Sequence, residues 1–148
     1  MEISTTRMLQ FSQQFKKFYA RQFAPLIRKS RLSMREVDVL LFLANNPAYD
    51  TARDIAEFRS LAKSQVSQAV ELLTAEGLLQ RTPDGEDRRV VHLSITPEGA
   101  PIAKEAQEIQ SRCGQQLFAG LTAQQMLQLR TILEIVLHNG EQLEEASV

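Results

Sequence analysis

The chain has 148 residues, enough for a single domain with a sizeable hydrophobic core. Its composition, 43% hydrophobic and 24% charged, is that of a globular protein and excludes a disordered one. The formal net charge of −1 gives no overall sign of a nucleic-acid binder, because such proteins are often basic.

Membrane and metal sites are also disfavoured by the sequence. The longest apolar run, from Val39 to Ala44, is too short to cross a bilayer, and no secretory signal is apparent, so we expect a cytoplasmic location and no membrane partner. The single cysteine, Cys113, fits a reducing compartment. His92 and His138 lie far apart and form no cluster with metal-ligand spacing, so we expect no metal and no cofactor.

Charge is distributed unevenly along the chain. Every charged residue between Arg7 and Arg35 is basic, whereas every charged residue from Glu134 onward is acidic. The eight basic residues of the first segment are Arg7, Lys16, Lys17, Arg21, Arg28, Lys29, Arg31 and Arg35. Such asymmetry fits either attraction of an anionic partner to one face or an ordinary solvated helix surface.

The first half of the chain is predicted to be helical. Apolar residues recur at helical spacing between Met8 and Phe23, and Pro25 is expected to kink or end this first helix. A second helix begins with the capping box formed by Ser33 and Glu36 and ends near residues 45–47. Thr51 and Asp54, at the same spacing, begin a short third helix.

A fourth helix and a hairpin follow. The helix covers residues 63–75, and Gly77 supplies the left-handed residue that ends it. Residues 78–81 and 90–95 have the pattern of two strands. The polar loop between them, residues 82–89, is rich in turn formers, which predicts a hairpin with a charged tip.

Two more helices are predicted beyond the hairpin. The first covers residues 97–118, with Thr96 as its cap and proline at its first position. The last begins after Thr122, which forms a capping box with Gln125. It is expected to reach at least the Asn139–Gly140 pair, which should end or loosen it.

Two short helices followed by a hairpin are the order of a winged helix-turn-helix, in which the second helix of the pair enters the major groove of DNA. The start of the fourth helix offers side chains suited to base edges and phosphates, because glutamine can pair with adenine and serine or lysine can bind phosphate. These candidate residues are Lys63, Ser64, Gln65, Ser67 and Gln68. An ordinary polar helix face explains the same residues without DNA.

Four segments at fixed separations resemble the MarR family of bacterial regulators. They are Asp54-Ile55-Ala56, residues 63–68, the LLTAEGLLQR run of residues 72–81, and the EDRRVVHLSITPEG run of residues 86–99. The most specific part is the Asp-Arg-Arg element in the last of them. The resemblance covers Leu32 to about Gly99.

The resemblance implies a mainly α protein with a winged helix-turn-helix, acting as a homodimer. Residues 1–32 would form an N-terminal dimerisation helix, 33–96 the DNA-binding lobe and 97–148 C-terminal dimerisation helices, all in one continuous domain. The resemblance implies that the protein binds a pseudo-palindromic double-stranded DNA operator sequence-specifically and acts as a repressor. A small aromatic or organic-acid effector would release the repressor, but the resemblance assigns it no residues here.

Residue roles also follow from the resemblance. Arg89 would be the wing arginine that enters the minor groove, beside Arg88, with Asp87 as the carboxylate that orients it. This chain departs from the family at Gln68, where relatives often carry arginine. It departs again at Ala62, where a capping side chain is usual.

Two other kinds of protein were weighed. An enzyme is disfavoured, because Ser64 and Cys113 have no recognisable base partner or nucleophile motif. Cys113 is expected to be a small buried side chain. A protein-interaction module that uses the winged lobe without DNA is the alternative function, and the absence of a basic overall charge would suit it.

Overall fold

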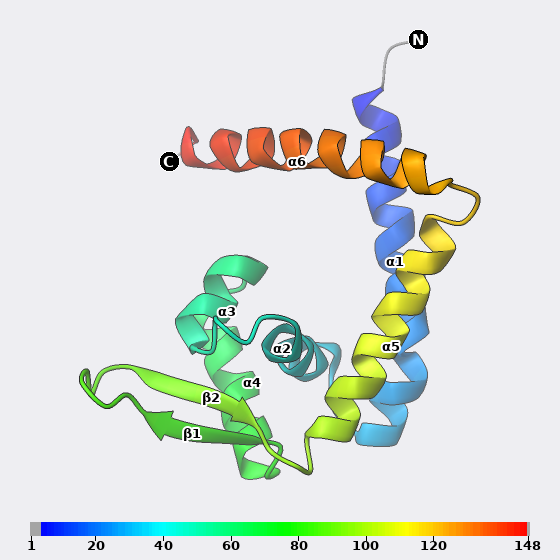
Figure 1. The fold of residues 1–148 in the computed structure, drawn as a ribbon. Coiled ribbons are helices and arrows are strands. Elements are labelled where there is room, and N and C mark those ends of the chain that lie inside the picture. Colours follow the sequence, from blue (N-terminus) through cyan, green and yellow to red (C-terminus); the bar gives the residue numbers. More distant parts are fainter. Residues whose placement is uncertain (1–3, 148) are drawn as a thin grey trace. The chain divides into compact units, whose positions relative to one another are not determined.

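The computed structural model describes residues 4–147, so residues 1–3 and 148 of the predicted terminal segments lie outside it. The chain divides into two compact units, one ending at Cys113 and one beginning at Gly114. The first unit contains α1 to α4, the strands β1 and β2, and most of α5, and the second contains α6 (Figure 1).

Helix α1 covers Thr5–Ser30 and runs through Pro25 without ending, so one of the two effects expected of this proline, an end of the helix, is wrong. A proline removes one backbone donor from a helix, but it does not stop a helix whose flanking residues are packed. Phe23 and Leu26, on either side of the proline, are both buried. The helix ends instead at Arg31, which adopts a left-handed φ of 60°.

The next three helices match their predicted spans closely. Helix α2 covers Met34–Asn45, α3 covers Ala52–Arg59 and α4 covers Lys63–Ala75. The capping box of α3 is present, with the backbone N–H of Asp54 donating to Thr51 Oγ1 at 3.1 Å and the N–H of Thr51 donating to Asp54 Oδ2 at 3.1 Å. Helix α4 has the predicted defect, since Ala62 provides no side-chain cap.

The predicted hairpin is present. Strand β1, Leu79–Pro83, pairs antiparallel with β2, Val91–Ile95, so that Leu79 lies opposite Ile95 and Pro83 opposite Val91. Gly77 adopts a φ of +72° just after α4, as the glycine signal indicates. Both strands and the loop between them form the wing of the fold (Figure 1).

Helix α5 covers Ala100–Leu117 and begins later than predicted. Thr96 accepts the N–H of Gly99 at 3.1 Å as a cap would, but its hydroxyl also donates to the Gly77 carbonyl at 2.6 Å, and residues 97–99 form a turn instead of a first helical turn. Gly99 is required there, because a Cβ at this position would lie 2.3 Å from the Leu78 carbonyl oxygen.

Helix α6 covers Ala123–Glu145 and begins with the predicted capping box, in which Thr122 Oγ1 accepts the N–H of Gln125 at 3.2 Å. The prediction that Asn139–Gly140 would end or loosen it is wrong as regards its end, since the helix continues through both residues. No residue of α6 is buried within the described chain, although many of its side chains are apolar.

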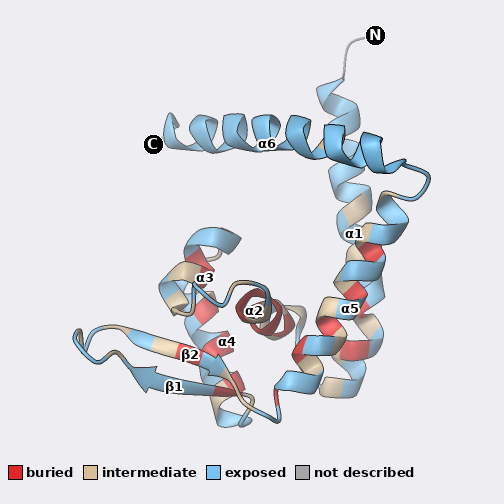
Figure 2. Cartoon of the chain, in the orientation of Figure 1, coloured by how far each residue is buried: buried red, intermediate tan, exposed pale blue. Residues whose placement is uncertain are grey.

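The hydrophobic core lies in the first unit. Figure 2 shows the buried positions on α2 and on the sides of its neighbours that face inward. Six consecutive α2 residues from Val37 onward include five that are at most 7% exposed. Cys113 is 2% exposed and has the buried position expected of it. The architecture is therefore the predicted one, mainly α with a two-stranded wing.

Candidate nucleic-acid interface

Helices α3 and α4 form the helix pair of the fold. Ile55 and Ala56 of α3 are buried, and so are Val66 and Ala69 of α4, which gives the two helices a shared apolar side. A tight turn joins them, in which Ser60 adopts a φ of 50° and ends α3. The turn leaves the first residues of α4 on the outside of the lobe.

The predicted groove-facing residues lie together on the first two turns of α4. Lys63, Ser64, Ser67 and Gln68 are exposed, and Gln65 is half-buried. Their helix begins without a side-chain cap, so the first backbone N–H groups of α4 are free of side-chain acceptors. Such an end carries a partial positive charge that favours an anion, and a phosphate could occupy it.

Sequence reasoning missed Arg53, which lies beside these residues. Arg53 is exposed on the first turn of α3 and, together with Ala52, Lys63 and Ser67, lines a surface cavity of about 190 Å³. Two cations and a hydroxyl therefore border one hollow between the two helices. Its place two residues after the Thr51 cap could be read from the sequence, but an isolated arginine forms no motif.

The charged residues of the wing are organised around Asp87. Its Oδ1 accepts the backbone N–H of Arg89 at 3.0 Å and the Arg89 Nε–H at 3.2 Å, while its Oδ2 lies 3.3 Å from Arg89 Nη2. The side chain and backbone of Arg89 thereby hold the pKa of Asp87 below its ordinary value. The Arg89 side chain is 91% exposed, so the pair fixes the direction of a guanidinium that faces solvent.

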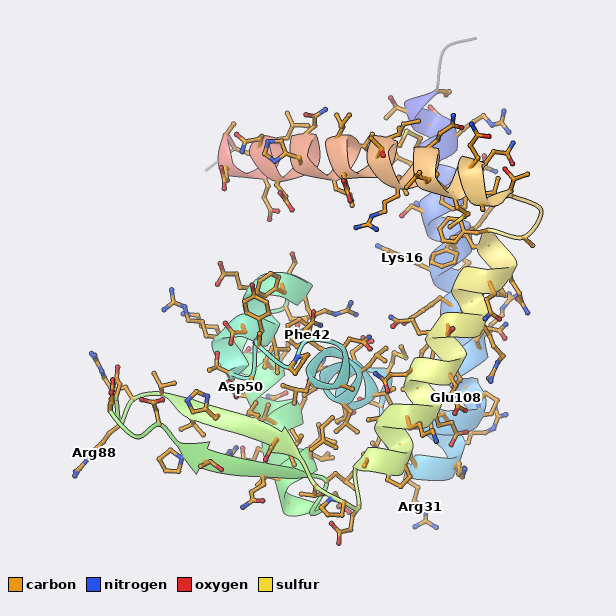
Figure 3. All side chains as sticks on the ribbon, in the orientation of Figure 1. Lys16, Arg31, Phe42, Asp50, Arg88 and Glu108 are labelled. Atoms are coloured by element: carbon orange, nitrogen blue, oxygen red, sulfur yellow. The ribbon has the colours of Figure 1, made fainter. Side chains whose placement is uncertain are left out.

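Arg88 differs from its neighbour. Among residues 4–147 it has no ion pair or side-chain hydrogen bond, and Figure 3 shows it extending from the tip of the hairpin. The three residues predicted for the wing are thus brought to one tip, with one cation anchored and the other free.

A second feature that sequence reasoning missed lies where the strands of the wing meet its loop, because His92 is paired with Thr82 near that end of the hairpin. His92 Nδ1 is 2.7 Å from Asp50 Oδ1, and His92 Nε2 is 2.7 Å from Asp84 Oδ1. These two carboxylates raise the pKa of His92. The pKa of Asp84 falls to about 2, because its carboxylate accepts the backbone N–H of Asp87, then the His92 ring, then the N–H of Glu86.

A second cavity, of about 370 Å³, lies in the first unit and is lined by no residue of the wing. It is lined by α1, the start of α2, the end of α3 and α5, and its residues are Phe15, Lys16, Tyr19, Ala20, Met34, Asp38, Arg59 and Gln110. Arg59 Nη2 lies 3.2 Å from Asp38 Oδ1, and the Tyr19 hydroxyl accepts Gln110 Nε2 at 3.1 Å. Burial raises the pKa of Asp38 despite the nearby guanidinium.

Comparison with known proteins gives this surface its context. The sequence model of the MarR family matches residues 32–90, which include α2, α3, α4, β1 and the wing loop. The chain is 30% identical to the HTH-type transcriptional repressor IacR of Pseudomonas putida over 125 residues, 84% of this chain and 74% of that protein. It belongs to the MarR family.

Other MarR-family comparisons agree. The homoprotocatechuate degradative operon repressor of Escherichia coli is 27% identical over 122 residues, 81% of this chain and 82% of the repressor. The fold matches the crystal structure of an S. aureus MepR–DNA complex with a TM-score of 0.72 and 17% identity, over 92% of this chain and 96% of that one. The family is one of transcriptional regulators.

Two further observations concern this MarR-family chain. No helix among the described residues is long and apolar enough to span a membrane. Within residues 4–147, no group of three or more His, Cys, Asp or Glu side chains is arranged to hold a metal ion.

Proposed function

We propose that the chain is a transcriptional repressor that binds a double-stranded DNA operator with α4 and the wing. The observation that carries the proposal is the exposed polar face of α4, residues Lys63 to Gln68, on the helix that follows α3 in a MarR-family lobe. The relatives are named as repressors, and the MepR structure is a complex with DNA.

Local charge supports the proposal better than the net charge does. Arg53 and Lys63 border the same hollow beside α4, and Arg88 and Arg89 carry the wing tip. Each of these cations can neutralise a phosphate, which releases counterions and favours binding at low salt. The net charge of −1 comes partly from acids after Glu134, which are remote in sequence from these elements.

Selection of bound sequences from a random duplex pool tests the proposal directly. The selected operator should be an imperfect palindrome with half-sites about one helical turn apart, roughly 34–36 Å. Lys63→Ala and Arg89→Ala should each weaken binding and lower the salt slope by about one unit per protomer. Lys104→Ala, which removes the same charge from an exposed position on α5, is the matched control and should change neither.

The alternative function gives a different result in the same assay. A protein-interaction module would show no salt-dependent affinity for any duplex, and Lys63→Ala would change nothing in this assay. Recovery of no preferred sequence by the purified, folded protein would therefore reject the repressor and favour the interaction module.

Dimerisation is the second part of the proposal, with segments 1–32 and 97–148 forming the interface. Met8 and Phe11 of α1 are about half exposed, and Leu127 and Leu137 of α6 are 66% and 64% exposed, which leaves apolar surface for a second copy to cover. Leu127→Glu should shift the protein toward monomer in light scattering at micromolar concentration. Gln128→Glu adds the same charge one residue along the helix and should stay dimeric; a wild-type monomer would contradict the proposal.

Release by a small aromatic or organic acid is the third part. The 370 Å³ cavity combines aromatic rings, Phe15 and Tyr19, with the cations Lys16 and Arg59, a set that suits a planar anion. Figure 3 shows Lys16 extending from α1. We expect an aromatic acid, from a panel that includes homoprotocatechuate, to lower operator affinity and raise the melting temperature.

The neighbouring lysines provide the control for that experiment. Lys16→Gln should weaken the response to the acid, whereas Lys17→Gln, which lies outside the cavity lining, should leave the response unchanged. A panel that alters neither operator affinity nor melting temperature would reject an effector of this class.

A further inference from the structure

His92 joins two parts of the lobe that are far apart in sequence. It lies on β2, while Asp50 belongs to the segment before α3 and Asp84 to the wing loop. The backbone reinforces the first contact, because the N–H of Leu93 donates to the Asp50 carbonyl at 2.7 Å. Figure 3 shows Asp50 between α3 and the hairpin, where it can tether the wing to the helices.

The ring can bind both carboxylates only when it is protonated. An ionised carboxylate accepts hydrogen bonds and donates none, while a neutral imidazole has one N–H and one lone pair. A neutral His92 would therefore keep one of its two 2.7 Å contacts as a hydrogen bond and turn the other into a contact between a lone pair and an anion. The imidazolium donates to both.

The contact extends from His92 to the DNA-facing arginine through the wing loop. Asp84 Oδ1 contacts the His92 ring, and Asp84 Oδ2 accepts the backbone N–H groups of Glu86 at 3.0 Å and Asp87 at 2.9 Å. Asp87 in turn holds Arg89 by its backbone and guanidinium. A continuous set of bonds thus connects His92 on β2 to the tip of the wing.

We propose that His92 is a positioning residue for the wing, which holds Arg89 in its DNA-binding position while the ring is protonated and loosens it when the ring is neutral. The proposal rests on the proposed function of the wing in DNA binding. Operator affinity should then fall as the pH rises, because His92 loses its proton, although His92 itself need not contact DNA.

The direction follows from the charged groups around the ring. Asp50 faces it from the segment before α3 and Asp84 from the wing loop, while its β1 partner, Thr82, does not titrate. The nearby Asp54 is engaged with Thr51, and Asp87 with Arg89. The two contacts from His92 to Asp50 and Asp84 form a clasp. Because the pKa of His92 is raised from 6.5, this clasp is complete below that pH and is lost as the pH rises through the raised pKa.

Operator affinity should be measured at constant ionic strength from about pH 6 to about pH 9, where histidine titrates but lysine and arginine do not. Wild-type affinity should fall by at most about tenfold per pH unit for each linked His92, and so by at most about a hundredfold for a dimer that places two wings on the operator. His92→Gln should bind weakly and with little pH dependence. His92→Arg, which keeps two donors and a permanent charge, should bind well and also show little pH dependence.

His138→Gln is the matched control, because it removes the only other histidine, which lies on α6. It should keep the wild-type pH profile. If His92→Gln keeps that profile instead, or if wild-type affinity changes by less than about twofold across the range, the proposal is overturned.

A measurement without DNA separates this proposal from the proposed function. NMR titration of the free protein should give a His92 pKa above its ordinary value of 6.5, and Asp50→Asn and Asp84→Asn should each lower it. The wing amides of residues 84–90 should become more mobile over the same pH range. If the wing loosens in this way but the protein binds no duplex, the proposed DNA-binding function is rejected and the role of His92 in ordering the wing is supported. If the wing amides do not respond to His92 protonation, the proposed role of His92 is rejected.

Discussion

Removal of Asp87 separates two accounts of the wing, because they predict opposite signs. If the wing were a simple cationic patch, Asp87→Ala would tighten DNA binding by removing a negative charge near phosphate. The structure favours the opposite outcome, since Asp87 makes three contacts of 3.0–3.3 Å to the backbone and guanidinium of Arg89. Without them an arginine whose side chain is 91% exposed loses its fixed direction.

The sizes of the two effects decide the sign. A unit charge about 10 Å from phosphate in water changes binding by roughly twofold. Fixing a freely rotating arginine side chain is worth up to about thirtyfold in an equilibrium constant, and loss of part of that order should cost about three- to tenfold. We therefore expect Asp87→Ala to bind about two- to fivefold more weakly overall, after the Coulomb gain is subtracted.

Glu86→Ala provides the control for this prediction. It removes the same charge from the adjacent, exposed wing position, and the Glu86 side chain has no hydrogen bond or ion pair with any other described residue. It should tighten binding slightly. The three proteins should be titrated against one operator by fluorescence anisotropy at two salt concentrations, with the melting temperature as a folding check. Tighter binding by Asp87→Ala would refute the orienting role of the carboxylate.

Three other predictions follow from the structure. Gly99→Ala should destabilise the protein by about 1–3 kcal/mol in urea unfolding, because the new Cβ would lie 2.3 Å from the Leu78 carbonyl oxygen, and unchanged stability would contradict that contact. Gln65→Ala or Gln68→Ala should relax base preference at one or two positions, each by about 1–3 kcal/mol; equal weakening on all sequences would indicate backbone contacts instead. The ordering of the wing loop that depends on Asp84 should be complete above pH 3.8 and be lost as the pH falls toward about 2, as followed by NMR, and Asp84→Asn should remove this transition.

Local signals explain which parts of the fold could be predicted from the sequence. The capping box at Thr51, the glycine at position 77 and the turn formers of the wing loop act over a few residues, and each specified its element correctly. The helix does not end at Pro25, because packing outweighs the local cost of the proline: Phe23 and Leu26, on either side of it, are both buried. The predicted start of α5 is too early, because the Thr96 hydroxyl also donates a hydrogen bond to the carbonyl of Gly77, 19 residues earlier.

The residues of the candidate site also differ in how far apart in sequence their partners lie. The residues of α4 and the Asp87–Arg89 pair are close in sequence, so a motif could indicate them. His92 and Asp50 are 42 residues apart, and their contact depends on how the hairpin folds back on the segment before α3. The Asp38–Arg59 pair beside the cavity likewise requires α2 and α3 to be in place. No single-sequence pattern specifies such pairs.

The joint between the hairpin and α5 has a mechanical consequence. Thr96 is fastened to the Gly77 carbonyl, its N–H donates to the Leu78 carbonyl at 3.1 Å, and Gly99 is pressed against that same carbonyl. The base of the wing and the start of α5 are therefore joined rigidly, and the hairpin does not rotate relative to α5 at this junction. A change that reorients the wing tip while this junction stays folded therefore has two routes. It can alter the loop of residues 84–90, or it can rotate the hairpin together with the start of α5.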